Sequence, residues 1–484
     1  MEDISDLKKK GLKSSVWNFF NLLINQLRNF IVTLVLARLL TPADFGLVSM
    51  AMVLNSILDF FVDFGFSSAI IRKSKITDIE ISTVFWWNII LGGICTFLVF
   101  ICAPILAWFY EMPKLVSVVH ITSWSFFISS FGTLQTALFQ RSLNFRTPFI
   151  ARLISGIISG IIGIALALYG WGVWALVFST FSGYLIYSAS IWGMSTWRPK
   201  LIFKPRSVGD MISFGWKMTL STLINRIFRQ LDTFIIGKLY SAASLGLFNR
   251  AQSLNNLVIE YSFSSIRSVM LPSLSKLQDD NELLKYSVIK LLNVISFLTF
   301  LFAGLMYICA NDLILFLYGD QWKGAIEIFQ ILGLFSISLC LPIVFDTIMT
   351  VVNRMNMYLW VSILRSSLLA FAIPFGLYYG LMAYVWAISI IGMIKLIPTF
   401  FTTKKCIGLS IMIQLNSIIR YILPFILPLI IWNFVQFKTD IHLVNIILKS
   451  IYFVILYIGI NVIMKNKGFM TCKSLIIEFV NKKK

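Results

Sequence analysis

Long apolar runs alternate with short polar segments along the whole chain. An α-helix needs about 20 apolar residues to cross the hydrocarbon core of a bilayer, so each run is long enough to be one membrane span. The pattern therefore predicts an all-α polytopic membrane protein. We count about 14 transmembrane helices, at approximately residues 14–38, 45–70, 83–109, 116–138, 148–169, 172–195, 211–237, 246–270, 288–310, 325–350, 357–378, 380–402, 413–435 and 442–463.

Polar residues interrupt four of these spans at the spacing of a helix face. Residues three or four positions apart lie on one side of a helix, so each set forms a polar stripe. Ionisable groups within a membrane usually face the interior of a helix bundle or a water-filled cavity, and the stripes therefore predict a hydrated cleft. They comprise Asn25, Arg28 and Asn29 in the first span, Asn55, Asp59 and Asp63 in the second, Asn225, Arg226, Arg229 and Asp232 in the seventh, and Asn256, Glu260 and Arg267 in the eighth.

The first and seventh spans belong to an internal repeat. A gapless shift of 200 positions aligns residues 22–55 with 222–255 and pairs Asn25 with Asn225 and Gly46 with Gly246. The shift covers six predicted spans, so both copies enter the membrane in the same orientation, as in transporters whose two lobes rock to give alternating access. We predict two pseudo-symmetric six-helix lobes around a central cavity: an N-terminal lobe over 1–195, a cytoplasmic linker over 196–210, a C-terminal lobe over 211–403, and two extra C-terminal helices with a basic cytoplasmic tail over 404–484.

Composition supports the membrane assignment and explains the charge. The 484 residues are 58% hydrophobic and 13% charged, whereas soluble domains are roughly 25% charged. Most of the net charge of +20 comes from Lys and Arg in alternate loops and in both tails. By the positive-inside rule, this distribution predicts that both termini are cytoplasmic. The basic excess is topological, and we do not expect nucleic-acid binding.

No catalytic or metal-binding motif is evident in the sequence. The six cysteines include no CxxC pair, so we infer neither a disulfide framework nor a zinc site. A membrane-embedded polysaccharide polymerase or glycosyltransferase would need a soluble catalytic domain or a long external loop, and neither is seen in this chain. We therefore expect a transporter with no bound cofactor rather than an enzyme.

Arginines in the first and seventh spans are candidate ligands for an anion. A charge near the centre of a span costs about 2.5–3.5 kcal/mol to insert, and these arginines outnumber the nearby acid, Asp232. A guanidinium group can bind phosphate oxygens through two hydrogen bonds. We predict that an anionic head group, a pyrophosphate or an acidic sugar, is bound by Arg28, Arg226 and Arg229 together with Asn25 and Asn225.

The remaining intramembrane charges have two interpretations. They either line the cavity and have a role toward the substrate, or they form internal ion pairs and helix contacts, such as Arg229 with Asp232 or Glu260 with Arg267. Both interpretations stay open on the sequence alone. The residues concerned are Asp59, Asp63, Asp232, Glu260 and Arg267.

Four blocks of sequence resemble the bacterial polysaccharide transporter family. They are ARLLTPADFGLVSMAMV (37–53), DFGFSSAII (63–71), LDTFIIGKLYSAASLGLFNRAQSL (231–254) and LPSLSKLQDD (271–280). This family is the O-antigen and colanic-acid type lipid-linked oligosaccharide flippase branch of the multidrug/oligosaccharidyl-lipid/polysaccharide exporter (MOP) superfamily. The loop YSAASLG departs from the family pattern, which more often has a Gly-containing loop that ends in Glu-Ala-Leu-Gly.

The resemblance implies a flippase of the bacterial cytoplasmic (inner) membrane. Its substrate would be an undecaprenyl-pyrophosphate-linked oligosaccharide repeat unit, used for lipopolysaccharide O-antigen, capsule or exopolysaccharide biosynthesis. A gradient of protons or sodium would supply the energy, and a polysaccharide polymerase and glycosyltransferases would be partners. The nearest rival is a multidrug/cation antiporter of the same superfamily, in which acidic groups would be expected to dominate the cavity.

Overall fold

The structure is a computed structural model that describes residues 24–73, 75–435 and 439–481. Some side chains within residues 212–225, 260–269 and 475–480 lie outside the description. All secondary-structure elements of the described part are helices. Contacts group the chain into two compact units, Met1–Gly246 and Leu247–Lys484.

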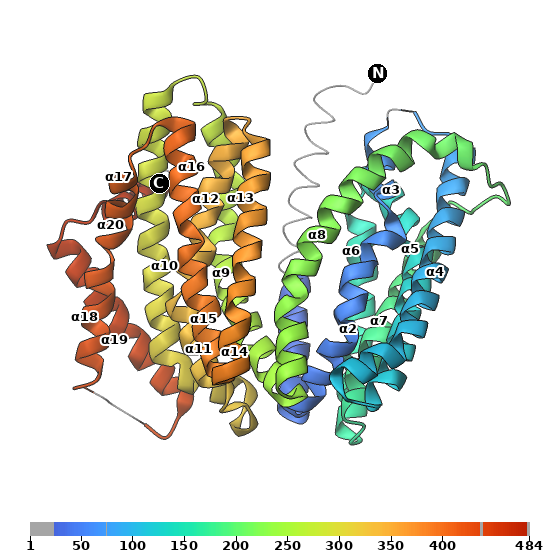
Figure 1. The fold of residues 1–484 in the computed structure, drawn as a ribbon, viewed down its shortest axis with the longest axis horizontal. Helices are drawn as coiled ribbons and strands as arrows, with labels where there is room; N and C mark the ends of the chain where they lie inside the picture. The colour runs from blue at the N-terminus through green and yellow to red at the C-terminus, as the bar shows by residue number, and fades with distance from the viewer. Residues whose placement is uncertain (1–23, 74, 436–438, 482–484) are drawn as a thin grey trace. The chain divides into compact units, whose positions relative to one another are not determined.

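The first unit is built from antiparallel helices (Figure 1). Helix α4 packs against α5 and α6 against α7, while α8 lies along α2 and α3. Within the predicted linker, the backbone nitrogen of Lys200 donates to the Ser82 hydroxyl, which ties this segment to α4. The helices are one over residues 24–39, then α2 (Pro42–Asp63), α3 (Phe66–Arg72), α4 (Asp78–Tyr110), α5 (Lys114–Arg141), α6 (Arg146–Leu168), α7 (Val173–Met194), the 3-10 helix η1 (Pro205–Val208), α8 (Gly209–Leu239) and the first turn of α9 (Ala242–Ser275).

The second unit is organised around one long helix, α10 (Asn281–Tyr318), which is largely buried. Helices α11, α12, α17, α19 and α20 all pack against it. The other elements are η2 (Asp320–Trp322), α11 (Ala325–Leu334), α12 (Ile337–Val351), α13 (Met355–Ser367), η3 (Leu368–Ala372), α14 (Ile373–Tyr379), α15 (Leu381–Ile394), α16 (Leu396–Ile407), α17 (Ile411–Ile419), α18 (Ile422–Trp432), α19 (His442–Ile463) and α20 (Lys467–Asn481).

The prediction of an all-α polytopic membrane protein is confirmed. Among the described residues, 11 helical segments are long and apolar enough to cross a bilayer, and each matches one predicted span. The other predicted spans, 14–38, 211–237 and 246–270, contain residues or side chains outside the description, so the count of 14 stays a prediction. The lobe boundaries predicted from the repeat, and the cavity between the lobes, also stay predictions.

In the part of the chain that the structure describes, five predicted spans are broken rather than continuous. The tenth divides between α11 and α12, the eleventh at η3, and the twelfth between α15 and α16. The second span divides at Phe64 and Gly65, whose φ angles of 46° and 76° end α2 before α3 begins. The thirteenth divides at Arg420 and Tyr421, between α17 and α18. Hydropathy averages over about a turn or more of chain, so it does not reveal a local change of backbone direction.

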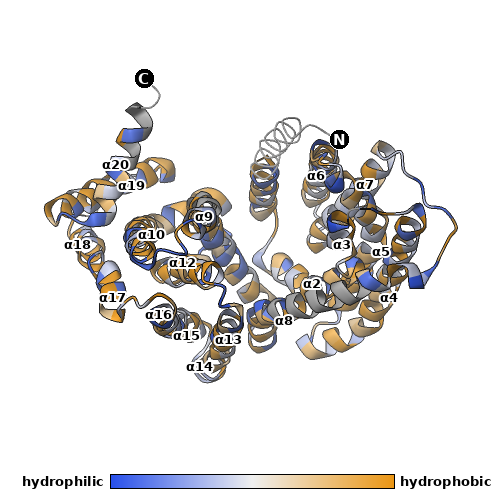
Figure 2. Ribbon diagram, turned by 90° about the horizontal axis from the view of Figure 1, so that it is seen from above, coloured by the Kyte–Doolittle hydropathy of each residue, from blue (hydrophilic) through white to orange (hydrophobic). Residues whose placement is uncertain are grey.

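The outer faces of both units remain apolar. Figure 2 shows hydrophobic residues along most helices, including the sides that face away from their neighbours. Trp108 is 79% exposed, and Ile105 and Ile161 are 60% and 61% exposed. Soluble proteins rarely expose continuous apolar surface on this scale, so these faces are suited to contact lipid.

The repeat-related helices α2 and α9 begin with equivalent caps. The Thr41 hydroxyl accepts a hydrogen bond from the Asp44 backbone nitrogen at 3.3 Å, and the Asp44 carboxylate accepts one from the Thr41 backbone nitrogen at 3.0 Å. At the corresponding positions, the Ser241 hydroxyl accepts from the Ser244 backbone nitrogen at 3.1 Å. Such caps satisfy N–H groups that have no partner within the helix. The loop that departs from the family pattern therefore keeps the capping chemistry.

Two repeat-related glycines allow these helix starts to touch. A Cβ atom on Gly46 would lie 1.7 Å from the Ala242 carbonyl oxygen, and one on Gly246 would lie 1.9 Å from the Pro42 carbonyl oxygen. The two contacts are reciprocal, because Pro42 and Ala242 are themselves related by the shift of 200 positions. A local two-fold relation produces this kind of reciprocity. The paired glycines of the sequence repeat therefore have a packing role.

A buried ionic cluster joins α10 to α19 in the second unit. The Lys449 ammonium lies 2.5 Å from one carboxylate oxygen of Asp312, and the side chain of Asp312 is only 3% exposed. The other oxygen accepts a hydrogen bond from the Asn445 amide at 3.1 Å and lies 2.9 Å from Nδ1 of His442. Desolvated charges of this kind persist when they are paired and hydrogen-bonded. The cluster therefore fixes the position of α19 on α10.

We expect Gly46→Ala and Gly246→Ala each to lower the free energy of unfolding by about 1–3 kcal/mol, because the added methyl meets backbone that cannot move aside. Thermal unfolding of the purified protein in detergent would measure the change. Gly93→Ala is the matched control, since no atom of the described residues lies within 4 Å of a Cβ on that helical glycine. Equal unfolding temperatures for all three variants would contradict the close contact.

We expect Lys449→Met to lower the free energy of unfolding by about 3–5 kcal/mol, because it leaves the Asp312 carboxylate buried without its cation. The double variant Asp312→Leu/Lys449→Met should recover most of that loss. Lys323→Met is the control, since its ion pair with Asp320 is exposed and worth at most about 1 kcal/mol. Chemical unfolding followed by tryptophan fluorescence would measure all three.

Candidate anion site in the first unit

Two glycines bring the helix over residues 24–39 close to α6. A Cβ on Gly160 would lie 2.7 Å from a Val32 methyl, and one on Gly156 would lie 1.8 Å from the Arg28 guanidinium. Small residues four positions apart on a membrane helix let a neighbouring helix approach closely. Gly156 and Gly160 thus form the surface against which Arg28 lies.

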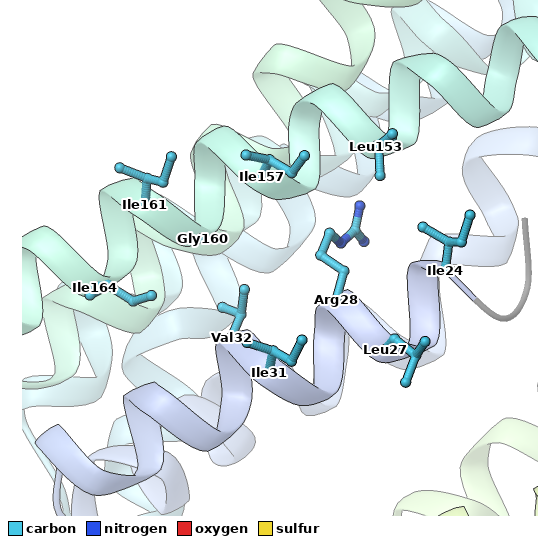
Figure 3. Close-up of a pocket in the computed structure, with 10 residues that line it drawn as sticks. All are labelled: Ile24, Leu27, Arg28, Ile31, Val32, Leu153, Ile157, Gly160, Ile161 and Ile164. Carbon is cyan, nitrogen blue, oxygen red and sulfur yellow. The ribbon is translucent and has the colours of Figure 1, made fainter.

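Arg28 is held in this contact by its own hydrogen bonds. One terminal nitrogen donates to the Arg152 carbonyl oxygen, and the other donates to the Asn29 side-chain oxygen at 2.8 Å. Figure 3 shows the guanidinium group pointing from its helix toward α6, near Leu153 and Ile157. Arg28 forms no ion pair with any residue that the structure describes. Its charge is therefore fixed in position and has no carboxylate partner in the described chain.

A cavity of about 410 Å³ surrounds this arginine. Among the described residues of its lining, Arg28 is the only charged one (Figure 3), and the others are aliphatic or glycine. Known ligand sites are commonly about 300–1,000 Å³, mostly apolar, with a few placed polar groups. The described residues that line it are Ile24, Leu27, Arg28, Ile31, Val32, Leu153, Ile157, Gly160, Ile161 and Ile164.

Arg226 is partly neutralised within the same unit. It donates to the Ser56 carbonyl oxygen at 2.7 Å and lies 3.6 Å from a carboxylate oxygen of Asp59. Its guanidinium carbon also lies 6.0 Å from the centre of the Phe60 ring. Arg226 and Asp59, both predicted site residues, therefore contact each other and tie α8 to α2.

Arg229 presents its charge differently. It is exposed on α8 and forms no hydrogen bond or ion pair with the described residues, so it is not paired with Asp232. Asp232 is half-buried on the same helix and has interactions of its own. The charge of Arg229 is thus exposed and has no partner among the described residues.

The other predicted site residues divide into two groups. Asn25 is half-buried on the helix that carries Arg28. The side chains of Asn225, Glu260 and Arg267 lie outside the described part of the structure, so their predicted roles stay predictions.

Asp63 has a structural contact at the break in the second span. Its carboxylate accepts hydrogen bonds from the backbone nitrogen of Ser67 at 3.0 Å and from the Ser67 hydroxyl at 2.5 Å. Ser67 lies in the first turn of α3, where backbone N–H groups lack helical partners. Asp63 therefore caps α3, and its predicted role in the cavity or in coupling stays a prediction.

The geometry adds three residues that the sequence prediction did not place in the site. Arg152 supplies the carbonyl group that orients Arg28, and its own guanidinium lies 5.8 Å from the Tyr187 ring centre. Gly156 and Gly160 supply the contact surface. The spacing of the two glycines was visible in the sequence, but the sequence did not show that Arg28 is the side chain facing them.

Comparison with known proteins places these features in a family. The family described as "Polysaccharide biosynthesis protein" matches residues 35–327. The lipopolysaccharide biosynthesis protein WzxC of Escherichia coli (strain K12) is 26% identical over 333 residues, which cover 67% of each chain. The succinoglycan biosynthesis transport protein ExoT of Rhizobium meliloti (strain 1021) is 25% identical over 312 residues, covering 64% of this chain and 62% of ExoT.

One solved structure shows how far the fold is shared. The lipid II flippase MurJ, in an inward closed conformation, superimposes with a TM-score of 0.72 over 94% of this chain and 99% of MurJ. The sequences are only 15% identical over this match, so the likeness concerns the fold.

We expect Asp63→Ala to lower the free energy of unfolding by about 1 kcal/mol, because a first-turn N–H of α3 loses its acceptor. Asp63→Asn should cost less, since its amide oxygen can still accept. Asp59→Ala is the comparison, because a partly exposed ion pair contributes at most about 1 kcal/mol. Unfolding curves in detergent would rank the three, and an equal effect of the Ala and Asn variants at Asp63 would argue against capping.

Proposed function

The chain belongs to the polysaccharide biosynthesis protein family, and on this premise we propose that it is a flippase for polyprenyl-pyrophosphate-linked oligosaccharide repeat units. It moves them across the bacterial cytoplasmic membrane for the biosynthesis of surface polysaccharide, which is O-antigen, capsule or exopolysaccharide. The observation that carries this proposal is Arg28, a positioned guanidinium in an apolar cavity with no ion pair to the described residues. The names of the relatives, one of which is a transport protein, support it.

In the proposed mechanism, arginines bind the anionic head group while the two lobes alternate access. Arg28 and Arg229 contact the pyrophosphate directly, since neither has an ion pair with a described residue. Arg226 lies beside the Asp59 carboxylate, and it also binds the pyrophosphate when a phosphate oxygen replaces Asp59 as its partner. Asn25 and Asn225 donate amide hydrogen bonds to the same oxygens. A guanidinium suits this role because its planar fork matches two phosphate oxygens.

The orientation and energy source are part of the proposal. Both termini lie in the cytoplasm, as the distribution of Lys and Arg predicts. A proton or sodium gradient drives the cycle, and Asp59, Asp63, Asp232, Glu260 and Arg267 are the candidate coupling residues. A polysaccharide polymerase would consume the flipped unit, and glycosyltransferases would supply it.

Complementation of a flippase-deficient strain tests the role of the arginines. We expect Arg28→Ala and Arg229→Ala each to reduce surface polysaccharide by about tenfold or more, since each removes a charge-assisted contact of about 1.5–3 kcal/mol. Lys variants should retain more export than Ala variants. Arg420→Ala is the control, because the side chain of this exposed arginine between α17 and α18 donates to its helical neighbour Asn416, and its backbone carbonyl, which accepts from Asn466, is unchanged by the substitution. Full export by the Arg28→Ala/Arg229→Ala protein at normal membrane levels would contradict the proposal. If the wild-type protein restored no export and conferred drug resistance instead, the antiporter function would be favoured.

Gly156→Ala provides an independent test of Arg28. The added methyl meets the flexible end of Arg28 and should displace it, so export should fall as it does in Arg28→Ala. Combining the two variants should cause no further loss, because both act on one contact. Gly93→Ala, where the space is open, should export normally. Additive losses of export in the double variant would show that Gly156→Ala does not act through Arg28.

A further inference from the structure

The cavity around Arg28 has the length and depth of a lipid tail site. From Gly156, which faces Arg28, to Ile164 at the far end of the lining, α6 rises roughly 12 Å. One leaflet contributes about half of a hydrocarbon core of ~30 Å, or roughly 15 Å. A chain that starts at Arg28 and follows the lining would therefore cross most of one leaflet.

The aliphatic walls of the cavity are partly exposed. Ile157 and Ile161, both in its lining, are 47% and 61% exposed, and Ile31 on the opposite helix is 58% exposed. These side chains form the walls of a groove between the helix over residues 24–39 and α6 (Figure 3). Exposed aliphatic walls of this kind are suited to contact a hydrocarbon chain.

The charge at one part of the groove selects the class of lipid. Arg28 donates to the backbone carbonyl oxygen of Arg152, which makes the two residues neighbours beside the apolar lining, while the guanidinium carbon of Arg152 lies 5.8 Å from the Tyr187 ring centre. Neither arginine forms an ion pair with the part of the chain that the structure describes. A diphosphate carries more negative charge than the single phosphodiester of an ordinary phospholipid, and it offers oxygens to two guanidinium groups.

We propose that this groove binds the first isoprenoid units of a polyprenyl diphosphate, with Arg28 and Arg152 at the diphosphate and Ile157, Ile161 and Ile164 along the tail. The inference rests on the proposed function, and it locates the lipid part of the substrate within the first unit. Arg152 is a further head-group ligand, and α6 is the helix along which the tail lies.

Photolabelling of the full-length protein in phosphatidylcholine nanodiscs tests the groove. The probe is farnesyl diphosphate with a diazirine at its tail end, and labelled peptides are mapped by mass spectrometry. We expect label in residues 157–164 and 31–32. Undecaprenyl diphosphate should compete, whereas phosphatidylglycerol at the same concentration should not. Equal competition by phosphatidylglycerol would overturn the proposal, because the groove would then be a site for bulk anionic lipid.

Matched variants separate a groove effect from a general surface effect. Ile161→Trp fills the groove and should reduce labelling by about tenfold, while Ile105→Trp, at an equally exposed position on α4, should label like the wild type. Arg152→Gln should weaken labelling by the diphosphate probe and leave labelling by diazirine-tagged farnesol unchanged. Equal labelling of the Ile161→Trp and Ile105→Trp proteins, or label confined to other helices, would overturn the groove.

The two proposals fail in different ways. If the wild-type protein restores polysaccharide export but the probe labels other helices, the groove is wrong and the flippase function stands. If the wild-type protein restores no export in any suitable deletion strain, the function itself is wrong, whatever the probe labels.

Discussion

Hydrocarbon offers no hydrogen-bond partner, and this constraint governs the whole molecule. Backbone N–H and C=O groups must be satisfied within the protein, which leaves helices as the spanning elements of this chain. Where helices start or break, side chains supply the missing hydrogen bonds. Thr41 and Asp44 cap α2, Ser241 caps α9 and Asp63 caps α3. Polar residues that looked functional from their position in the sequence therefore serve in part to satisfy the backbone.

The same constraint determines which charges remain for a ligand. Asp312 and Lys449 neutralise each other within the second unit, and Arg226 is partly neutralised by Asp59. Arg28 differs because its hydrogen bonds go to a carbonyl and an amide oxygen, which orient the guanidinium without removing its charge. A charge oriented by neutral groups is preorganised for an anion, which is the condition for a strong charge-assisted contact.

Glycine residues determine how closely helices pack at two places, the starts of α2 and α9 and the contact between α6 and the helix over residues 24–39. Helices in a membrane gain no hydrophobic free energy from each other, so they associate through close packing of small residues. Gly46 and Gly246 let the repeat-related helix starts touch, and Gly156 and Gly160 bring α6 against the helix of Arg28. The first pair was visible in the sequence as a matched position in the repeat. The second became meaningful only when its partner helix was known.

The sequence by itself determined the fold class and the eleven spans that the structure confirms, because hydropathy and helical spacing depend on residues that are close together in the chain. Its motifs also identified the family. It also identified Arg28, since a charge in an apolar run stands out without any structure. Only the tertiary structure decided the environment of each charge. The contacts of Arg28 with α6 and of Arg226 with Asp59 join segments that are far apart in the sequence. The hydrogen bond between Asp63 and Ser67 depends on the local change of backbone direction between α2 and α3. Hydropathy does not record such contacts, because it describes how a residue partitions into lipid and not which residue it meets there.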